Sequence, residues 1–174
     1  MIEIFNGNSF NSLDAKANGI KWLKIANIGI GVIKWDIESY LPFEFWNKFK
    51  AYQVHNGDYV VALTRPILNH ELKISQLQED DTSLLNQRVG KLIFKENSDY
   101  AYQLLRKRNI VDYIEKTISG TDPPNLSSNS LNLVVADVPN EKEQNKIGKF
   151  LLYFDKTIAS NQRHQKKPQR FNPL

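Results

Sequence analysis

The segment Tyr59-Val60-Val61-Ala62-Leu63-Thr64 constrains the fold of this chain more than any other stretch. It follows the turn triplet Asn56-Gly57-Asp58 and ends just before Pro66. Glycine accepts the positive φ of a tight turn at no steric cost, and proline lacks the N–H that a strand ladder needs. A short run of apolar and β-branched residues bounded in this way predicts a buried β-strand.

Further strands are predicted on both sides of this segment. Apolar and polar residues alternate over 21–28, and two more strand-like runs cover 88–94 and the β-branched stretch 131–138. Residues 1–19, rich in Asn, Ser and Gly, and the polar stretch 121–130 predict loops. The strands are therefore separated by long irregular connections.

Helices are predicted between and after these strands. A short helix is expected near 43–49, and a longer one over 98–119, whose apolar residues fall near one face. Gly120 stands where a left-handed C-cap belongs.

The C-terminal part of the chain predicts one more, amphipathic helix. Asn140 is a good N-cap, with Glu143 as its capping-box partner three residues on. This helix carries an apolar stripe at helical spacing, formed by Ile147, Phe150, Leu151, Phe154 and Ile158. The stripe could pack on the domain itself, but its length and terminal position favour pairing with a partner helix. We expect the helix over 140–161 and a basic, proline-broken, disordered tail over 162–174. The fold class is α+β, with mixed or antiparallel strands followed by a coiled-coil-type helix.

Composition narrows the function only a little. The formal net charge of +4 weakly favours an anionic partner such as nucleic acid. The absence of cysteine excludes disulfides, thiolate catalysis and cysteine-ligated zinc. No signal peptide or membrane-spanning run is present in the sequence, so we expect a cytoplasmic protein.

One set of residues suggests an enzyme. Asp58, Glu71 and Lys73 match the residue types with which Mg²⁺-dependent nucleases hold the cation and stabilise charge at the scissile phosphate. Such triplets also arise by chance, and Asp58 doubles as a turn residue, so this nuclease remains an alternative. The three histidines have no metal-binding spacing, and we predict no metal site.

Polar residues beside the predicted strand ends suggest DNA reading instead. Arginine paired with guanine, and Asn or Gln paired with adenine, are common contacts in the major groove. Thr64-Arg65 and Asn86-Gln87-Arg88 place such side chains at strand ends, and small polar residues over 119–128 could donate to phosphates or base edges. Salt bridges and plain turns are the alternative reading.

The ordered series of motifs resembles the specificity subunit of type I restriction-modification enzymes. It consists of Trp22-Leu23-Lys24-Ile25-Ala26-Asn27-Ile28, Gly57 to Pro66, Leu85-Asn86-Gln87-Arg88-Val89-Gly90, Ser119 to Ser128, Val138-Pro139 and Glu143-Gln144-Asn145-Lys146-Ile147. The resemblance runs from about Gly19 to Asn161.

The resemblance implies a non-catalytic subunit that recognises double-stranded DNA. In that family two target-recognition domains, joined by long antiparallel helices, each read half of a bipartite site. Methyltransferase subunits supply S-adenosylmethionine chemistry, and a translocase-nuclease subunit uses ATP and Mg²⁺, so no cofactor is expected here. This chain would hold one such domain over 1–139, and would pair with a copy of itself or a second half-subunit. A remnant that only docks on methyltransferase subunits is a further alternative.

The resemblance also assigns positions to two surfaces. The surface expected to face DNA comprises Lys24, Asn27, Thr64, Arg65, Asn69, Asn86, Gln87, Arg88, Ser119, Thr121, Asn125, Ser127 and Ser128. The partner-helix surface is the apolar stripe Ile147, Phe150, Leu151, Phe154 and Ile158.

Overall fold

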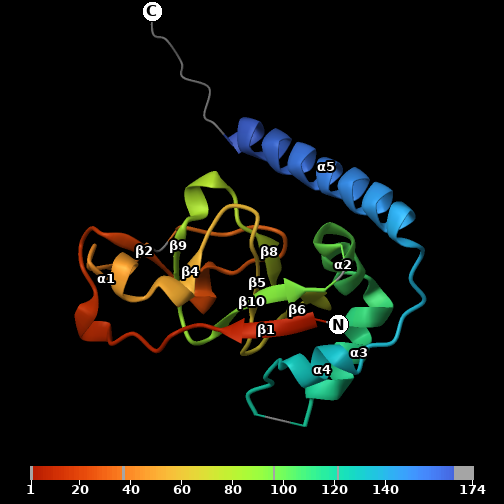
Figure 1. Ribbon diagram of the computed structural model, residues 1–174, viewed down its shortest axis with the longest axis horizontal. Helices are drawn as coiled ribbons and strands as arrows, with labels where there is room; N and C mark the ends of the chain where they lie inside the picture. The colour runs from red at the N-terminus through yellow and green to blue at the C-terminus, as the bar shows by residue number, and fades with distance from the viewer. Residues whose placement is uncertain (1, 37, 96, 121, 167–174) are drawn as a thin grey trace, which may run out of the picture.

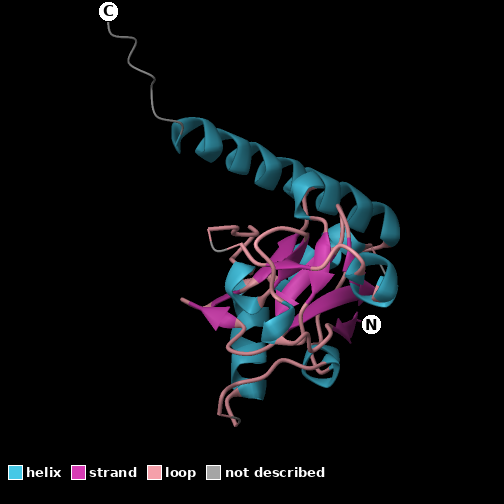
Figure 2. Ribbon diagram, turned by 90° about the vertical axis from the view of Figure 1, so that its left-hand side faces the viewer, coloured by secondary structure: helices cyan, strands magenta, loops and turns pink. Residues whose placement is uncertain are grey.

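Two packed β-sheets and a layer of helices form the structure, a computed structural model (Figure 1). It describes residues 2–36, 38–95, 97–120 and 122–166, with side chains as far as Ile158 and at Asn161. Figure 2 shows the strands gathered in the centre, with helices on the outside. The fold class is α+β, as the sequence predicts.

The first sheet is antiparallel and carries the predicted buried strand. Its order is β1 (Ile2–Asn6), β10 (Val89–Phe94), β5 (Tyr59–Ala62) and β8 (Ile74–Gln76). The second sheet is mixed, in the order β3 (Tyr40–Leu41), β2 (Ile20–Leu23), β9 (Ser83–Leu85) and β4 (Gln53–Val54). A separate hairpin joins β6 (Ile67–Leu68) to β7 (Glu71–Leu72).

The helices follow the chain from α1 near the second sheet to α5 at the C-terminal end. Their bounds are α1 (Phe45–Lys48), α2 (Ser98–Leu105), α3 (Arg108–Ile118), α4 (Ser128–Asn132) and α5 (Glu141–Lys166). Short 3-10 turns lie at Ser12–Asp14, Ile25–Asn27, Lys50–Tyr52 and Glu79–Asp81.

Strand β5 lies where the layers meet, which confirms the prediction for this segment. Successive side chains of a strand point to opposite faces. Tyr59 and Val61 therefore enter the cluster against α2 and α3, whereas Val60 and Ala62 enter the cluster shared with the second sheet. All four residues are buried, so β5 anchors both halves of the core.

The predicted N-terminal loop is wrong, because residues 2–6 form the edge strand β1. Ile2 and Ile4 pack on the helical cluster, and Phe5 packs on the cluster between the sheets. The outer edge of β1 is not left open. The Ile2 N–H donates to Asn132 Oδ1 and the Ile4 N–H to Ser128 Oγ, at 3.2 and 2.9 Å.

Two predicted elements end earlier than expected because the backbone turns. Strand β2 stops at Leu23, since Asn27 Oδ1 accepts from the Lys24 N–H at 2.9 Å and closes a 3-10 turn. The helix expected over 98–119 is divided into α2 and α3 by an extended residue, Lys107. Gly120 does not take the left-handed conformation that we predicted for it.

The C-terminal third also departs from expectation. Residues 131–138 form no strand: Leu131 lies in α4, whose N-cap Ser127 accepts from the Ser130 N–H. Helix α5 continues to Lys166, so the first part of the predicted tail is helical and residues 167–174 lie outside the described residues. The predicted N-cap is confirmed, since Asn140 Oδ1 accepts from the Glu143 N–H at 3.1 Å.

Two buried tyrosines predict that the fold loses stability at alkaline pH. Tyr59 and Tyr102 are each 3% exposed, and the Tyr59 hydroxyl donates to Asp99 at 2.6 Å. Burial raises the pKa of Tyr102 to about 12, and burial followed by the Asp99 hydrogen bond raises the pKa of Tyr59 further. The unfolded chain releases these protons near pH 10 while the folded chain keeps them.

We therefore expect the free energy of unfolding to fall from about pH 10 upward, by up to about 1.4 kcal/mol per pH unit for each tyrosine. Denaturant unfolding at several pH values measures this slope. Tyr59→Phe removes one titrating group and should make the slope shallower, and an unchanged slope in that variant would contradict the assignment.

Candidate functional site

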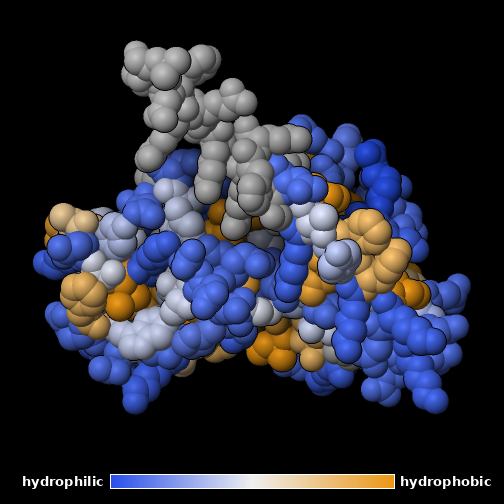
Figure 3. All heavy atoms as spheres, turned by 90° about the horizontal axis from the view of Figure 1, so that it is seen from above, coloured by the Kyte–Doolittle hydropathy of each residue, from blue (hydrophilic) through white to orange (hydrophobic). Residues whose placement is uncertain are grey.

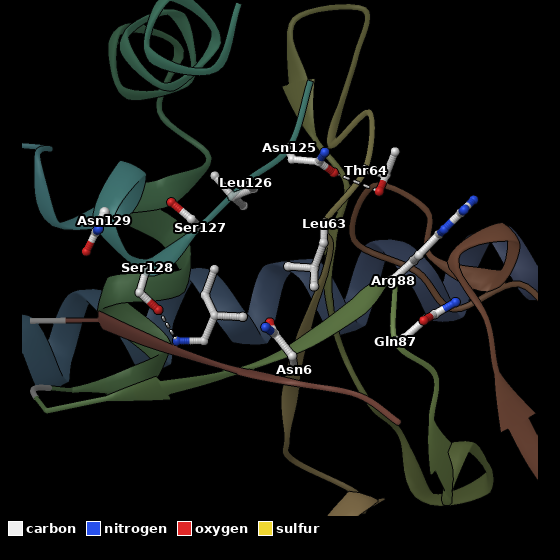
Figure 4. Close-up of a pocket in the computed structure, with 11 residues that line it drawn as sticks. Asn6, Leu63, Thr64, Gln87, Arg88, Asn125, Leu126, Ser127, Ser128 and Asn129 are labelled. Atoms are coloured by element: carbon white, nitrogen blue, oxygen red, sulfur yellow. Dashed lines mark hydrogen bonds between the residues drawn. The ribbon is translucent and has the colours of Figure 1, made fainter. Parts of the chain in front are cut away.

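Three chain segments far apart in the sequence meet at one end of the first sheet. They are the residues that follow β5, the turn between β9 and β10, and the stretch 125–129 that leads into α4 (Figure 4). Together with β1 they surround a pocket of about 460 Å³. Its lining comprises Ile4, Asn6, Leu63, Thr64, Gln87, Arg88, Asn125, Leu126, Ser127, Ser128 and Asn129. Six residues predicted to face DNA are among them: Thr64, Gln87, Arg88, Asn125, Ser127 and Ser128.

The first wall of the pocket is a short antiparallel pairing between the end of β5 and the loop before α4. The Leu126 N–H donates to Leu63 O at 2.8 Å, and the Arg65 N–H donates to Pro124 O at 2.9 Å. Between these bonds Thr64 Oγ1 donates to Asn125 Oδ1 at 2.8 Å. The backbone ladder therefore fixes the place of both polar side chains at the pocket rim.

The second wall is the tight turn between β9 and β10. The Val89 N–H donates to Asn86 O at 2.9 Å, which leaves Gln87 and Arg88 at the tip. The Leu63 N–H donates to Arg88 O at 3.0 Å and ties the turn to the first wall. Both tip side chains are exposed, so an amide and a guanidinium project side by side from a rigid support.

The third wall is the outer edge of β1, which the sequence did not reveal. Because N–H groups alternate sides along a strand, Ile2, Ile4 and Asn6 turn theirs away from β10. Ser128 and Asn132 occupy the first two of these positions, and Asn6 reaches the pocket. The alternation of Ile2 and Ile4 was the available signal for this strand.

Positive charge gathers beside the pocket. Arg65 is exposed and has a φ of 47°, a left-handed value that is uncommon for a residue with a side chain and that clusters at functional sites. Burial, and then the nearby charge of Arg65, lower the pKa of Lys73. Arg88, which lines the pocket itself, gives the rim a positive charge suited to an anionic ligand.

The structure contradicts one residue of the predicted DNA-facing surface, the buried Asn27, and it shows the half-buried Lys24 in contact with neighbouring side chains. Asn27 is 3% exposed, and its side chain closes the 3-10 turn and donates to Lys34 O, so it cannot contact a ligand without unfolding. The Lys24 ammonium lies 3.7 Å from the Trp22 ring centroid and donates to Ser39 Oγ at 3.0 Å. Burial lowers the pKa of Lys24, which agrees with an ammonium turned toward the protein.

The other predicted positions lie around the pocket or away from it. Asn86 is half-buried behind the turn tip, where its N–H donates to Leu23 O. Asn69 is at the tip of the β6–β7 hairpin, and Ser119 ends α3 with its hydroxyl bonded to Lys116 O. Thr121 lies outside the described residues. Ser128 lines the pocket, but its hydroxyl already accepts from the Ile4 N–H.

The nuclease triplet is not assembled. Asp58 and Lys73 flank opposite ends of the β5–β8 pairing, because Leu77 bonds to Asp58 while Ala62 bonds to Lys73. Four residues of strand separate them by about 13 Å, too far for one cation site. Asp58 instead pairs with Lys91 at 2.8 Å.

The structure brings one histidine to carboxylates that its sequence position did not suggest. Ligand atoms of His70, Asp112 and Glu115 lie within 4.8 Å of one another at the surface. His70 Nδ1 is 3.2 Å from Glu115 Oε2, and Asp112 accepts from Arg108 Nε at 2.9 Å. The His70–Glu115 pair joins the β6–β7 hairpin to α3, whereas Arg108–Asp112 lies within α3, and we assign no metal to this cluster.

Helix α5 turns its apolar stripe away from its own domain. The exposed fractions are 39% at Ile147, 62% at Phe150, 37% at Leu151, 46% at Phe154 and 53% at Ile158. In Figure 3, which looks down on the α5 side, apolar side chains form a patch on this face. Helix α5 lies beyond the sheets from the pocket, as Figure 4 shows in the background, so the two surfaces do not compete. In the described part of the chain no helix is long and apolar enough to cross a membrane.

Comparison with known proteins gives consistent matches. The family model described as "Type I restriction modification DNA specificity domain" matches residues 1–168. The chain is 30% identical over 174 residues to the type I restriction enzyme MjaVIII specificity subunit of Methanocaldococcus jannaschii, covering 98% of this chain and 41% of that protein. It is 29% identical over 149 residues to the EcoAI specificity subunit of Escherichia coli, covering 82% of this chain and 25% of that protein.

Solved structures share the fold. A chain from work on complex assembly and conformational transition of the type I R-M system superposes with a TM-score of 0.58 at 16% identity, covering 94% of this chain and 38% of that chain. The HsdS subunit of Thermoanaerobacter tengcongensis superposes with a TM-score of 0.52 at 16% identity, covering 96% of this chain and 38% of that chain. The chain thus spans less than half the length of each of these relatives.

Proposed function

Because the chain belongs to the family of type I restriction-modification DNA specificity domains, we propose that it reads one half of a bipartite double-stranded DNA target. The observation that carries this proposal is the pocket, which unites polar side chains from three distant segments and includes the exposed Arg88. Specificity domains are non-catalytic and bind no cofactor of their own, so the nuclease alternative is abandoned.

Each part of the pocket would have a distinct role in recognition. Gln87 and Arg88, exposed at the tip of a tight turn, would enter a groove, where Gln suits adenine and Arg suits guanine. Thr64 and Ser127 at the rim would contact phosphates. Arg65 would add charge beside them, and such contacts supply most of the salt-dependent affinity.

The partners proposed for this domain are those of a type I system. Methyltransferase subunits would bring S-adenosylmethionine, and the translocase-nuclease subunit would bring ATP and Mg²⁺ and contact this chain indirectly. Such an assembly acts on DNA in the cytoplasm. The apolar stripe of α5 would pack against the matching helix of a second recognition half or of a second copy of this chain, because its positions follow the three- and four-residue spacing of paired helices.

Selection from a randomised duplex pool, at two salt concentrations, tests the proposed function. We expect a short enriched motif, with affinity that falls steeply as salt rises. The same selection is repeated with methyltransferase subunits added. A pool that stays unenriched in both cases, while the subunits still co-purify with the chain, would contradict DNA reading and favour a docking-only role.

A further inference from the structure

Helix α5 contacts its own domain through a face on which Gln144 and Gly148 are buried and Leu152 is half-buried. Gly148 is buried against the first turn of α2. A Cβ atom at this position would stand 2.7 Å from the Tyr100 nitrogen and 2.9 Å from Asn97 Oδ1, closer than real Cβ atoms approach such groups. Glycine is therefore the residue that lets these two helices meet at this distance.

Polar contacts pin α5 on either side of its docking face. At the start of α2, Asn97 Nδ2 donates to Asn145 Oδ1 at 2.7 Å, while Asn97 also caps α2 by accepting from the Tyr100 N–H. At the end of α2, Gln103 Nε2 donates to Asp155 Oδ2 at 2.7 Å, and Arg106 Nη1 pairs with the same oxygen at 2.5 Å.

Contacts at two separate points fix the direction of α5, whereas a single contact would allow the helix to rotate about it. Asn145 and Asp155 are ten residues apart, which is about 15 Å along a helix. Between them Gly148 sets the closest approach, and Leu152 is half-buried. The apolar stripe is on another face of the same helix, so the direction in which it points follows from this docking.

We propose that Gly148 and Asp155 are positioning residues that fix the direction of α5 relative to the recognition pocket. Because the joining helices of this family set the spacing of the two half-sites, a change in the direction of α5 at these residues would change that spacing. The spacing step rests on the proposed function, whereas the direction of α5 stands on the contacts alone. Neither residue lines the recognition pocket.

The direction of α5 is tested by the distance between two spin labels. The chain has no cysteine, so Lys116→Cys on α3 and Asn161→Cys on α5, both exposed, give two defined label sites. The parent chain should give one narrow distance distribution. Gly148→Ala and Asp155→Ala should each shift or broaden it, while the matched control Lys149→Ala, on an exposed face, should leave it unchanged.

Thermal unfolding adds a second test, in which the direction of the change in melting temperature is decisive. Alanine favours the helix interior relative to glycine, so Gly148→Ala would raise the melting temperature if position 148 were an ordinary helical site. The docking contact predicts a lower melting temperature instead. A raised melting temperature together with an unchanged label distance in both variants would overturn the inference.

The spacing step is tested with duplexes that carry two selected half-sites at a series of separations. The parent chain, joined in pairs, should prefer one separation, and both variants should shift or widen that preference while binding a single half-site with unchanged affinity. If the parent does not bind a single half-site, the proposed function fails while the label distances still decide the direction of α5. Altered distances with an unchanged spacing preference would overturn the spacing step alone.

Discussion

Replacing Arg88 by alanine should weaken binding to the selected half-site by about 1–3 kcal/mol, roughly 5- to 150-fold, and relax the preference at one base position. The guanidinium stands at the tip of a two-residue turn, beside Gln87 and at the mouth of the pocket. The substitution should leave the fold intact, because the Arg88 side chain is exposed and the bond from the Leu63 N–H is accepted by the Arg88 backbone carbonyl. Titration of the selected duplex and of a scrambled duplex, by fluorescence anisotropy, measures the effect.

Lys95→Ala is the matched control for this change. Lys95 is exposed near the opposite end of β10, so the substitution removes the same charge about 20 Å away. It should leave both affinities near those of the parent chain. A loss that is uniform over all sequences, with a salt slope lower by about one, would show that Arg88 contacts a phosphate and not a base. Equal affinities in parent and variant would remove Arg88 from the interface.

The sequence could predict those features of the site that are determined by residues close to one another in the chain. Strand β5 is bounded by a glycine turn and a proline within the same short stretch, and its inward and outward residues follow from alternation. The position of Gln87 and Arg88 at a strand end likewise follows from the sequence, and the Val89 N–H to Asn86 O bond closes the turn there. These features need no information about distant parts of the chain.

The missed parts depend on distant partners. Strand β1 is short and followed by Asn and Gly, and it is stabilised by β10 and by Ser128 and Asn132, more than 120 residues away. Asn27 is of a residue type that reads DNA bases, yet its side-chain amide accepts from the Lys24 N–H and donates to Lys34 O. A polar side chain near a strand end therefore does not show by itself whether it faces solvent or satisfies backbone groups.

The face by which α5 docks could not be predicted from its pattern either. A surface helix usually turns its apolar stripe toward its own core. Here Gly148 and the polar pairs of Asn145 and Asp155 make the contact instead, and the stripe stays exposed. The same residue types fit either arrangement, because close approach at a glycine depends on the neighbouring helix.

Because the apolar stripe of α5 is exposed, Leu151→Glu should prevent this helix from pairing with a second helix without unfolding the domain. A carboxylate left unpaired in an apolar helix interface costs about 3–5 kcal/mol, which is roughly 150-fold or more in the dissociation constant. Leu151 is 37% exposed in the single chain, so the melting temperature at low concentration should change little. Sedimentation equilibrium over a range of concentrations measures the association.

Tyr153→Glu, which adds the same charge at a residue 68% exposed outside the stripe, should pair like the parent chain. If Leu151→Glu associates as strongly as Tyr153→Glu, the stripe is not the pairing surface; if the parent chain stays monomeric throughout, self-pairing is wrong and a different second half must cover the stripe.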